Sequence, residues 1–237
     1  MTVLMDQRLL APVSDPLYRG LVAYWPLGEA SGETRADAHI NGHDLTDNNG
    51  VAAAVGVIGS CAHPANATEY LSAADHADLS PTTAFTLSAW LNFDVLSGNQ
   101  YIAEKGSLNE HRCFIMHARN TGAIRCYISG DGEAIPQINT PAGALVISTW
   151  YHLCFVYDGG QAVNNDRYLI YKDTVQIANS WGTLPTSLND SAHAFTLSSA
   201  GFAMKGKIDE AGFWNRALNT REITRLYNRG NGLPVRA

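Results

Sequence analysis

The chain has 237 residues, of which 46% are hydrophobic and 16% charged, and its formal net charge is −6. This length fits one large β or α/β domain or two small ones, with enough apolar residues for a full core. Charged residues fall well below the roughly 25% of an average protein, which excludes a disordered chain, a coiled coil and a charge-rich helical bundle. The acidic balance argues against a nucleic-acid binder, which needs a basic face.

The first 18 residues are expected to form an N-terminal arm, and residues 19–237 the domain. Residues 1–17 show no clear hydrophobic period, and Asp6 and Arg8 interrupt any apolar run, so the pattern of a signal peptide is missing. No stretch of the sequence approaches the roughly 18 apolar residues of a membrane span. The sequence therefore predicts neither membrane insertion nor export by the usual route.

From Gly20 onward, short apolar runs alternate with turn residues. Residues 84–93 alternate between apolar and polar with period two, and Asn120-Thr121-Gly122 separates two runs as a hairpin turn would. About ten short strands at this spacing favour an all-β sandwich. The expected strands are 20–27, 70–72, 84–93, 101–104, 111–119, 123–129, 150–157, 167–177, 194–197 and 206–214.

One short helix is predicted near the C-terminus. Asn219 and Glu222 have the spacing of a capping box, apolar residues follow at helical spacing, and Gly230 is expected to end the helix. Arg221, Arg225 and Arg229 line one side of it. A solvated face is the simpler interpretation, and docking on an acidic partner is the alternative.

The four cysteines are Cys61, Cys113, Cys126 and Cys154, and they form no Cys-x-x-Cys motif. A zinc ribbon and a redox pair are therefore not expected. We expect four buried free thiols, because a core of this size needs no disulfide. The alternative is that Cys113 and Cys126 face each other across the predicted hairpin.

Several motifs then follow one another in a recognisable order. They are Gly20-Leu21-Val22-Ala23-Tyr24-Trp25-Pro26-Leu27-Gly28-Glu29, Asp37 with Asn41-Gly42, Phe85-Thr86-Leu87-Ser88-Ala89-Trp90, Trp150-Tyr151-His152, Tyr157-Asp158-Gly159, Gly206-Lys207-Ile208-Asp209-Glu210 and Phe213-Trp214-Asn215-Arg216-Ala217-Leu218. Over about residues 19–233 the chain resembles laminin G-like domains of the concanavalin A-like lectin/glucanase superfamily, of the kind found in phage virion and bacterial surface proteins. The resemblance implies a two-sheet antiparallel jelly roll.

This superfamily also contains enzymes, whose catalytic residues have characteristic spacings. Retaining glycosidases need two carboxylates about 5 Å apart, and the hydrolases that the chain resembles carry them as Glu-x-Asp-x-x-Glu. No such spacing occurs, and Asp209 and Glu210 are adjacent and so expected on opposite faces of a strand. Lyases of this fold use Gln-x-His, whereas Gln137-Ile138-Asn139 has Asn in the place of His. We therefore expect no catalytic residue and no enzyme.

Calcium is the metal that the sequence favours. Zinc at His39 and His43 is not expected, because their spacing converges on a metal only in a helix, which Asn41-Gly42 disfavours. Calcium prefers carboxylates and carbonyls from polar loops, and similar jelly rolls supply a carboxylate from the last strand. We predict a structural calcium site of Asp37, Asn41 and Asp209. In the alternative, Asp37 caps a turn and Asp209 pairs with an Arg or Lys.

Tyr101 and Trp181 are the candidate ligand-binding residues. Lectin-like sandwiches hold sugars with aromatic side chains and polar loops, and both residues are expected in loops. The alternative is that they pack over one end of the sandwich.

The predicted function is that of a non-catalytic structural or adhesion module on a phage virion surface, as a decoration, fibre or tail protein. Residues 1–17 would attach it to a capsid or tail protein, and the domain would bind host or environmental glycans; a homo-oligomer is compatible with this role. The alternative is a bacterial cell-surface or extracellular carbohydrate-binding module. A glycoside hydrolase or polysaccharide lyase of the same fold comes third.

Overall fold

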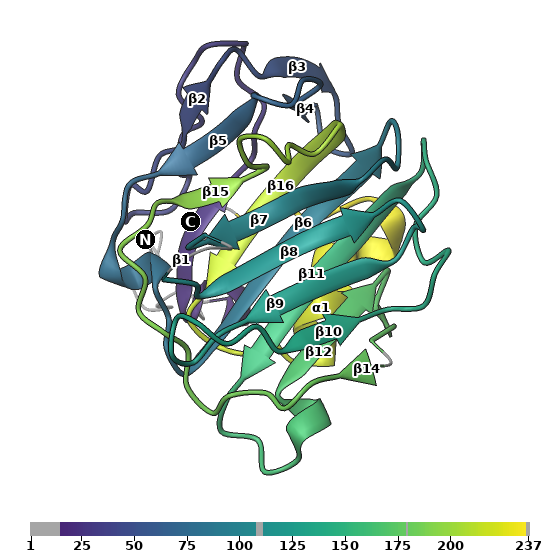
Figure 1. Cartoon of the computed structure of the whole chain (residues 1–237). Helices are drawn as coiled ribbons and strands as arrows, with labels where there is room; N and C mark the ends of the chain where they lie inside the picture. Colours follow the sequence, from purple (N-terminus) through teal and green to yellow (C-terminus); the bar gives the residue numbers. More distant parts are fainter. Residues whose placement is uncertain (1–14, 108–110, 179, 236–237) are drawn as a thin grey trace, which may run out of the picture.

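The computed structural model describes residues 15–107, 111–178 and 180–235 and contains two eight-stranded antiparallel sheets, one in front of the other in Figure 1. The first sheet runs in the order β13 (Val175–Gln176), β12 (Tyr168–Lys172), β11 (Trp150–Asp158), β6 (Ala84–Phe93), β16 (Gly206–Trp214), β4 (Ser60–His63) and β3 (Ala52–Val55), with β1 (Leu21–Trp25) also paired to β16. The second runs in the order β14 (Ser180–Trp181), β10 (Gln137–Asn139), β9 (Ile124–Ile128), β8 (Phe114–Arg119), β7 (Asn99–Lys105), β15 (Phe195–Leu197), β5 (Tyr70–Ala73) and β2 (Thr46–Asn48). The predicted two-sheet antiparallel sandwich is confirmed.

The main core lies between the two sheets and is rich in aromatic rings. Phe85 of the first sheet stacks on Phe114 of the second with ring centroids 4.8 Å apart, and Trp25 stacks on Phe195 at 5.4 Å. All four side chains are fully buried. Because alternate residues of a strand face the same side, the period-two pattern of β6 brings Phe85, Leu87, Leu91 and Phe93 into this core.

A single α-helix in the described part of the chain, α1 (Thr220–Tyr227), covers the outer face of the first sheet. Its Ile223 and Leu226 are buried in a second apolar cluster together with Trp214 of β16. Asn219 and Glu222 form the predicted capping box. None of the helices among the described residues is long and apolar enough to span a bilayer.

The helix ends earlier than the sequence indicated. Asn228 adopts the left-handed conformation at the C-cap, with φ of 46°, and a 3₁₀ turn at Asn228–Gly230 follows. Asparagine tolerates this conformation better than most residues do, so the stop lies there and not at Gly230.

Five strands among the described residues lie outside the predicted ranges. They are β2, β3, β4, β10 and β14, each of two to four residues. β3 is alanine-rich and β2 lies inside the polar 37–50 stretch, so neither has a strong local strand pattern. Pairing with a neighbouring strand, such as that of Ala53 in β3 with Ala62 in β4, holds them in the sheet.

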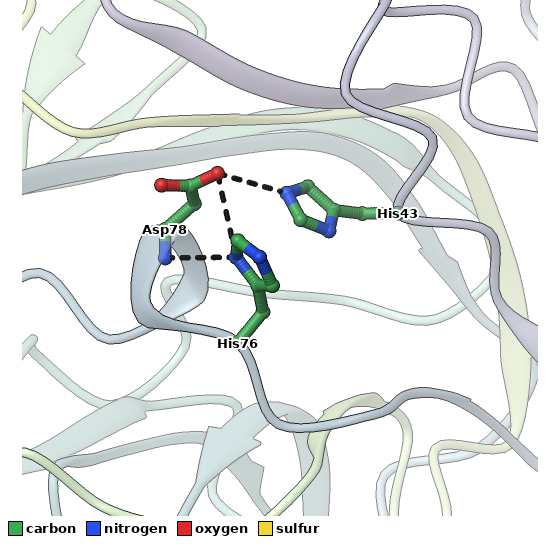
Figure 2. A group of neighbouring side chains, drawn as sticks. All are labelled: His43, His76 and Asp78. Atoms are coloured by element: carbon green, nitrogen blue, oxygen red, sulfur yellow. Dashed lines mark hydrogen bonds and ion pairs between the residues drawn. The ribbon is translucent and has the colours of Figure 1, made fainter.

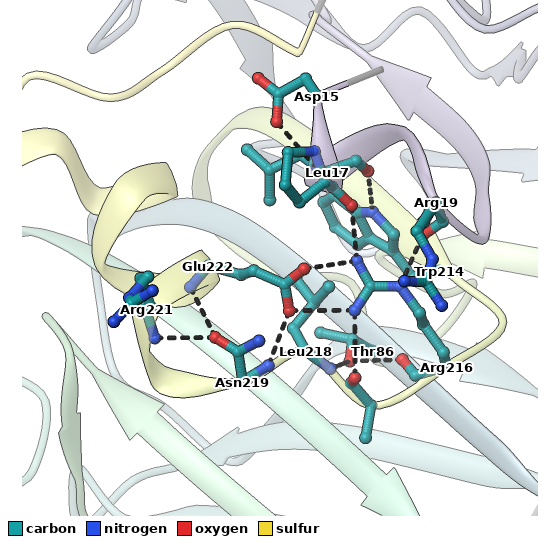
Figure 3. A network of polar contacts seen from close by, with 12 residues as sticks. Asp15, Leu17, Arg19, Thr86, Trp214, Arg216, Leu218, Asn219, Arg221 and Glu222 are labelled. Atoms are coloured by element: carbon teal, nitrogen blue, oxygen red, sulfur yellow. Dashed lines mark hydrogen bonds and ion pairs between the residues drawn. The ribbon is translucent and has the colours of Figure 1, made fainter. Parts of the chain in front are cut away.

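The described chain begins at Asp15, so most of the predicted arm, residues 1–14, lies outside the described residues. The short 3₁₀ helix Pro16–Tyr18 packs on the domain beside α1 (Figure 3). Leu17 is 1% exposed, and its carbonyl oxygen accepts a hydrogen bond from Nε1 of Trp214 at 2.7 Å. Asp15 pairs with both terminal nitrogens of Arg225 at 2.7 and 2.6 Å.

The four cysteines are buried and free, as expected, and no disulfide joins Cys113 to Cys126. Burial raises the pKa of each thiol to about 12. Thiols of this kind remain protonated at neutral pH and act as small apolar side chains.

Candidate functional site

The outer face of the second sheet is the surface on which aromatic and polar side chains gather. On β8, Phe114 and Met116 belong to the core, so Ile115 and His117 face outward. Register places His117 opposite Arg125 of β9 and Tyr101 of β7. In Figure 1 this sheet lies in front of the first sheet, and α1 lies behind.

Four rings form what we call the aromatic row across this face: Tyr127, His117, Tyr101 and Phe202. Tyr127 stacks on His117 with centroids 5.4 Å apart, His117 contacts Tyr101 at 5.6 Å, and Tyr101 stacks on Phe202 at 4.8 Å. Tyr101 is 2% exposed, whereas Phe202, in the loop between β15 and β16, is 45% exposed. The row thus ends in a ring that is partly exposed to solvent.

His117 acts in this row as a neutral ring. Burial, together with the positive charges of Arg125 and Arg119, lowers its pKa to about 4. Neither of its ring nitrogens has a hydrogen-bond partner among the described residues. A neutral imidazole held this way contributes packing surface and no charge.

A polar hollow of about 280 Å³ lies beside the aromatic row. Its polar lining is supplied by Tyr70, Ser72, Glu104, Ser107, His193, Thr196 and Ser199. Thr196 of β15 lies in register between Ser72 of β5 and Glu104 of β7, which lines up two hydroxyls and a carboxyl across three strands. Oγ1 of Thr196 has no hydrogen-bond partner among the described residues.

Glu104 joins the polar hollow to the aromatic row. Its Oε1 accepts a hydrogen bond from the hydroxyl of Ser199, but burial outweighs that bond and raises the pKa of the carboxyl. Burial, with a smaller contribution from Glu104, also raises the pKa of Tyr101. Ser199 also connects the two features, since its carbonyl oxygen accepts a hydrogen bond from the N–H of Phe202 at 3.1 Å.

This arrangement has the chemistry of a binding surface. An exposed ring stacks on an apolar ligand face, while the hydroxyls and the carboxyl form hydrogen bonds. Among the described residues that line the polar hollow, Glu104 is the one carboxylate, whereas glycoside hydrolysis commonly uses two.

The predicted calcium ligands in the 37–41 loop are bonded to backbone groups. Oδ1 of Asp37 accepts hydrogen bonds from the N–H groups of Tyr24 and His39, and Oδ2 accepts one from His43, all at 2.8–2.9 Å. Nδ2 of Asn41 donates to the carbonyl oxygen of Val22 at 2.9 Å. Asp37 thus organises its own loop, as the turn-capping alternative describes.

Asp209 is fully buried on β16. Its Oδ2 accepts hydrogen bonds from the N–H groups of Val57 and Ile58 at 2.6 and 2.9 Å, while Oδ1 has no partner among the described residues. Burial outweighs these bonds and raises its pKa to about 6. No hydrogen bond or ion pair between described residues joins Asp37, Asn41 and Asp209, and calcium binding there stays a prediction.

The two predicted ligand-binding aromatics lie on strands and not in loops. Tyr101 belongs to β7 and lies beneath Phe202. Trp181 belongs to β14 at the far edge of the same sheet, half-buried, with its Nε1 donating to the carbonyl oxygen of Tyr168 at 2.9 Å. Sequence reasoning missed Phe202, His117 and Glu104; the period-two alternation of 111–119 could have placed His117 on the outer face.

Comparison with known proteins gives the same picture of the fold. The binding domain of Paraclostridial Mosquitocidal Protein 1 superposes with a TM-score of 0.67 at 15% identity, covering 89% of this chain and 52% of that one. Trypanosoma rangeli sialidase superposes with a TM-score of 0.65 at 17% identity, covering 90% of this chain and 33% of that one. The chain thus spans about half and one third of the lengths of these two proteins.

No curated protein matches the sequence. The Laminin_G_3 family model, described as the concanavalin A-like lectin/glucanases superfamily, matches residues 65–224, which is more than half of the chain. With the two packed antiparallel sheets, this match shows that the chain belongs to the laminin G-like family of the concanavalin A-like lectin/glucanases superfamily.

Proposed function

We propose that this protein is a non-catalytic carbohydrate-binding module whose ligand lies on the outer face of the second sheet. The observation that carries the proposal is the exposed ring of Phe202 at the end of the aromatic row, next to the polar hollow. Sugars present apolar C–H faces and rings of hydroxyls, and this surface offers a partner for each.

Different residues of this surface would supply the stacking contact and the hydrogen bonds. Phe202 supplies the stacking face, and Tyr101 supports it from below at 4.8 Å. Thr196, Ser72 and Glu104 supply hydrogen bonds from neighbouring strands. Since rigid strands carry most of these groups, little conformational entropy is lost when a ligand binds.

The fold of the neighbours supports this class of function without identifying the ligand. One neighbour is named as a binding domain and the other as a sialidase. We favour binding over hydrolysis because the polar hollow has a single carboxylate in its described lining, and paired carboxylates are the usual hydrolytic machinery. A glycoside hydrolase or lyase stays the third candidate.

A glycan array followed by calorimetry tests the proposal. We expect Phe202→Ala to weaken binding of the best glycan about two- to twelvefold, since an aromatic stacking contact is worth about 0.5–1.5 kcal/mol. Val175→Ala is the matched control, because Val175 is an exposed apolar residue on β13 of the first sheet, 63% exposed. Equal weakening in both variants, or release of reducing sugar from the bound glycan, would overturn the proposal.

We further propose that the module belongs to a phage virion surface and is attached to a capsid or tail protein through the chain that precedes Asp15. The bonds of Asp15 to Arg225 and of Leu17 to Trp214 hold the first described residues on the domain, directly next to the proposed attachment segment. A bacterial cell-surface module is the alternative.

Deleting residues 1–14 leaves these bonds in place and tests the attachment. We expect the truncated chain to fold and to be missing from purified particles, by mass spectrometry, while the complete chain is present. Equal amounts of both chains on particles would refute attachment through the arm. Absence of the complete chain from particles would favour the cell-surface alternative.

A further inference from the structure

We propose that His43, His76 and Asp78 form a zinc-binding site. His43 lies in the loop before β2, and the other two lie at the 3₁₀ turn Ala77–Leu79 that follows β5, with Asp78 35 positions after His43 (Figure 2). The side chains point toward one another, and their ligand atoms all lie within 4.8 Å of one another. Neither the calcium prediction nor the proposed carbohydrate surface uses any of the three.

Two of the three distances between the donor atoms match the edges of a tetrahedral zinc site, and the third, between the two imidazole nitrogens, is within 4.8 Å. Nε2 of His43 lies 3.3 Å from Oδ2 of Asp78, and Nδ1 of His76 lies 3.4 Å from the same oxygen. Ligand atoms about 2.0–2.2 Å from a tetrahedral zinc ion lie about 3.3–3.5 Å from one another. A charged hydrogen bond between imidazole and carboxylate would be shorter, about 2.7–2.9 Å.

A second histidine–carboxylate pair in this protein shows the difference. Nε2 of His63 lies 2.6 Å from Oδ2 of Asp94, which is a direct hydrogen bond. Among the described residues, this pair is not part of a group of three metal-ligand side chains. The three residues of the proposed site are held further apart than this pair. The hydrogen bond between His43 and Asp78, at 3.3 Å, is longer than the bond between His63 and Asp94 and close to the spacing of two ligands around one zinc ion.

The backbone of His43 is held in place from both sides. Its N–H donates to Oδ2 of Asp37 at 2.9 Å, and its carbonyl oxygen accepts a hydrogen bond from Nε1 of Trp25 at 2.7 Å. Trp25 is a fully buried core residue. The His43 side chain is only 10% exposed, so one ligand is already fixed before an ion arrives.

The other two ligands are accessible to solvent. The side chains of His76 and Asp78 are 55% and 47% exposed, which leaves an ion a path into the site. Nδ1 of His76 at present accepts the N–H of Asp78 at 3.2 Å, and zinc would replace this long hydrogen bond. The spacing of His39 and His43 in the sequence gave no sign of this site, because His43 finds its partners in another segment.

The ligand chemistry points to zinc and not to calcium. Two imidazole nitrogens and one carboxylate oxygen suit a borderline ion such as Zn²⁺, whereas calcium takes six to eight oxygens. Three protein ligands leave the fourth tetrahedral position to water. Because both imidazoles must be neutral to bind the ion, affinity for zinc falls as the pH is lowered.

Titration of the complete, EDTA-treated chain with Zn²⁺ in a calorimeter tests the proposal. We expect one ion per chain, and at least about tenfold weaker binding in His76→Ala and in Asp78→Asn. His63→Ala is the matched control, because it removes a histidine that also pairs with a carboxylate. It should bind zinc as the natural chain does.

Cobalt absorption gives an independent readout of the geometry, since tetrahedral Co²⁺ absorbs visible light far more strongly than six-coordinate Co²⁺. We expect this signal in the natural chain and in His63→Ala, and its loss in His76→Ala. Far-UV circular dichroism checks that each variant is folded. No zinc binding in the natural chain, or an equal loss of binding in His76→Ala and His63→Ala, would overturn the proposal. Either result leaves the carbohydrate-binding proposal unaffected.

Discussion

Replacing Asp209 by Asn should change how the stability of the protein depends on pH. Asp209 is fully buried, and its pKa is raised from 3.8 to about 6 because burial disfavours the carboxylate. Between these values the folded chain keeps a proton that the unfolded chain has released. Unfolding then releases that proton. The contribution of Asp209 to the free energy of unfolding is therefore fully present at low pH and is lost as the pH rises toward 6.

The size of the effect follows from the difference between the two pKa values. A difference of about 2, at about 1.4 kcal/mol per unit, corresponds to about 2–3 kcal/mol between pH 4 and pH 7. The amide of Asn keeps an oxygen that can accept the N–H groups of Val57 and Ile58, but it does not titrate. Relative to the natural chain, Asp209→Asn should therefore gain about 2–3 kcal/mol of stability between pH 4 and pH 7.

Urea denaturation at pH 4, 5, 6 and 7 measures this difference. Other titrating groups are common to both chains and cancel in the comparison. Ile208→Val is the control, because Ile208 is its buried neighbour on β16 and the change should cost a similar amount, about 1 kcal/mol, at every pH. A difference between Asp209→Asn and the natural chain that stays constant across this range would refute the reasoning.

Two further predictions concern the C-terminal segment and calcium. Arg216→Ala should lower the free energy of unfolding by about 3 kcal/mol, because the guanidinium makes two bonds at 2.9 and 2.7 Å to Glu222, whose side chain is 8% exposed and would keep only the N–H of Asn219 (Figure 3). Asp15→Asn, at an exposed pair, should cost under about 1 kcal/mol. Similar urea midpoints for both variants would contradict this. The calcium prediction requires EDTA to lower the melting temperature of the natural chain in calorimetry but not that of Asp209→Ala. If EDTA leaves the melting temperature of the natural chain unchanged, the calcium prediction is wrong.

The sequence predicted those elements whose signals are local. The period-two pattern of residues 84–93 is β6, and the Asn219 and Glu222 capping box begins α1. The strands that it missed have weak patterns of their own. β14 is two residues long and is held by pairing of its Trp181 with Ile138 of β10, which is 43 positions earlier (181 − 138). Such pairing depends on the fold as a whole and leaves little trace in the local sequence.

The candidate sites were harder to predict because they are assembled from distant segments. The sequence identifies Tyr101 as a single aromatic residue. Its stacking contact with Phe202 depends on a loop about one hundred residues later in the chain. In the sequence, the nearest candidate zinc ligand to His43 is His39, whereas the fold places His43 beside His76. Sequence patterns identified the chemistry of single residues, and strand register decided which of them meet.

A glycan titration followed by ¹H–¹⁵N NMR tests the central claim, that the outer face of the second sheet binds carbohydrate. The glycan selected by the array would be added to the labelled chain, and the amide signals that move would be mapped onto the structure. We predict the largest shifts at Glu104, Thr196 and Phe202, with the amides of α1 on the opposite side of the molecule unchanged. Shifts confined to α1 or to the loops of the first sheet would contradict the account.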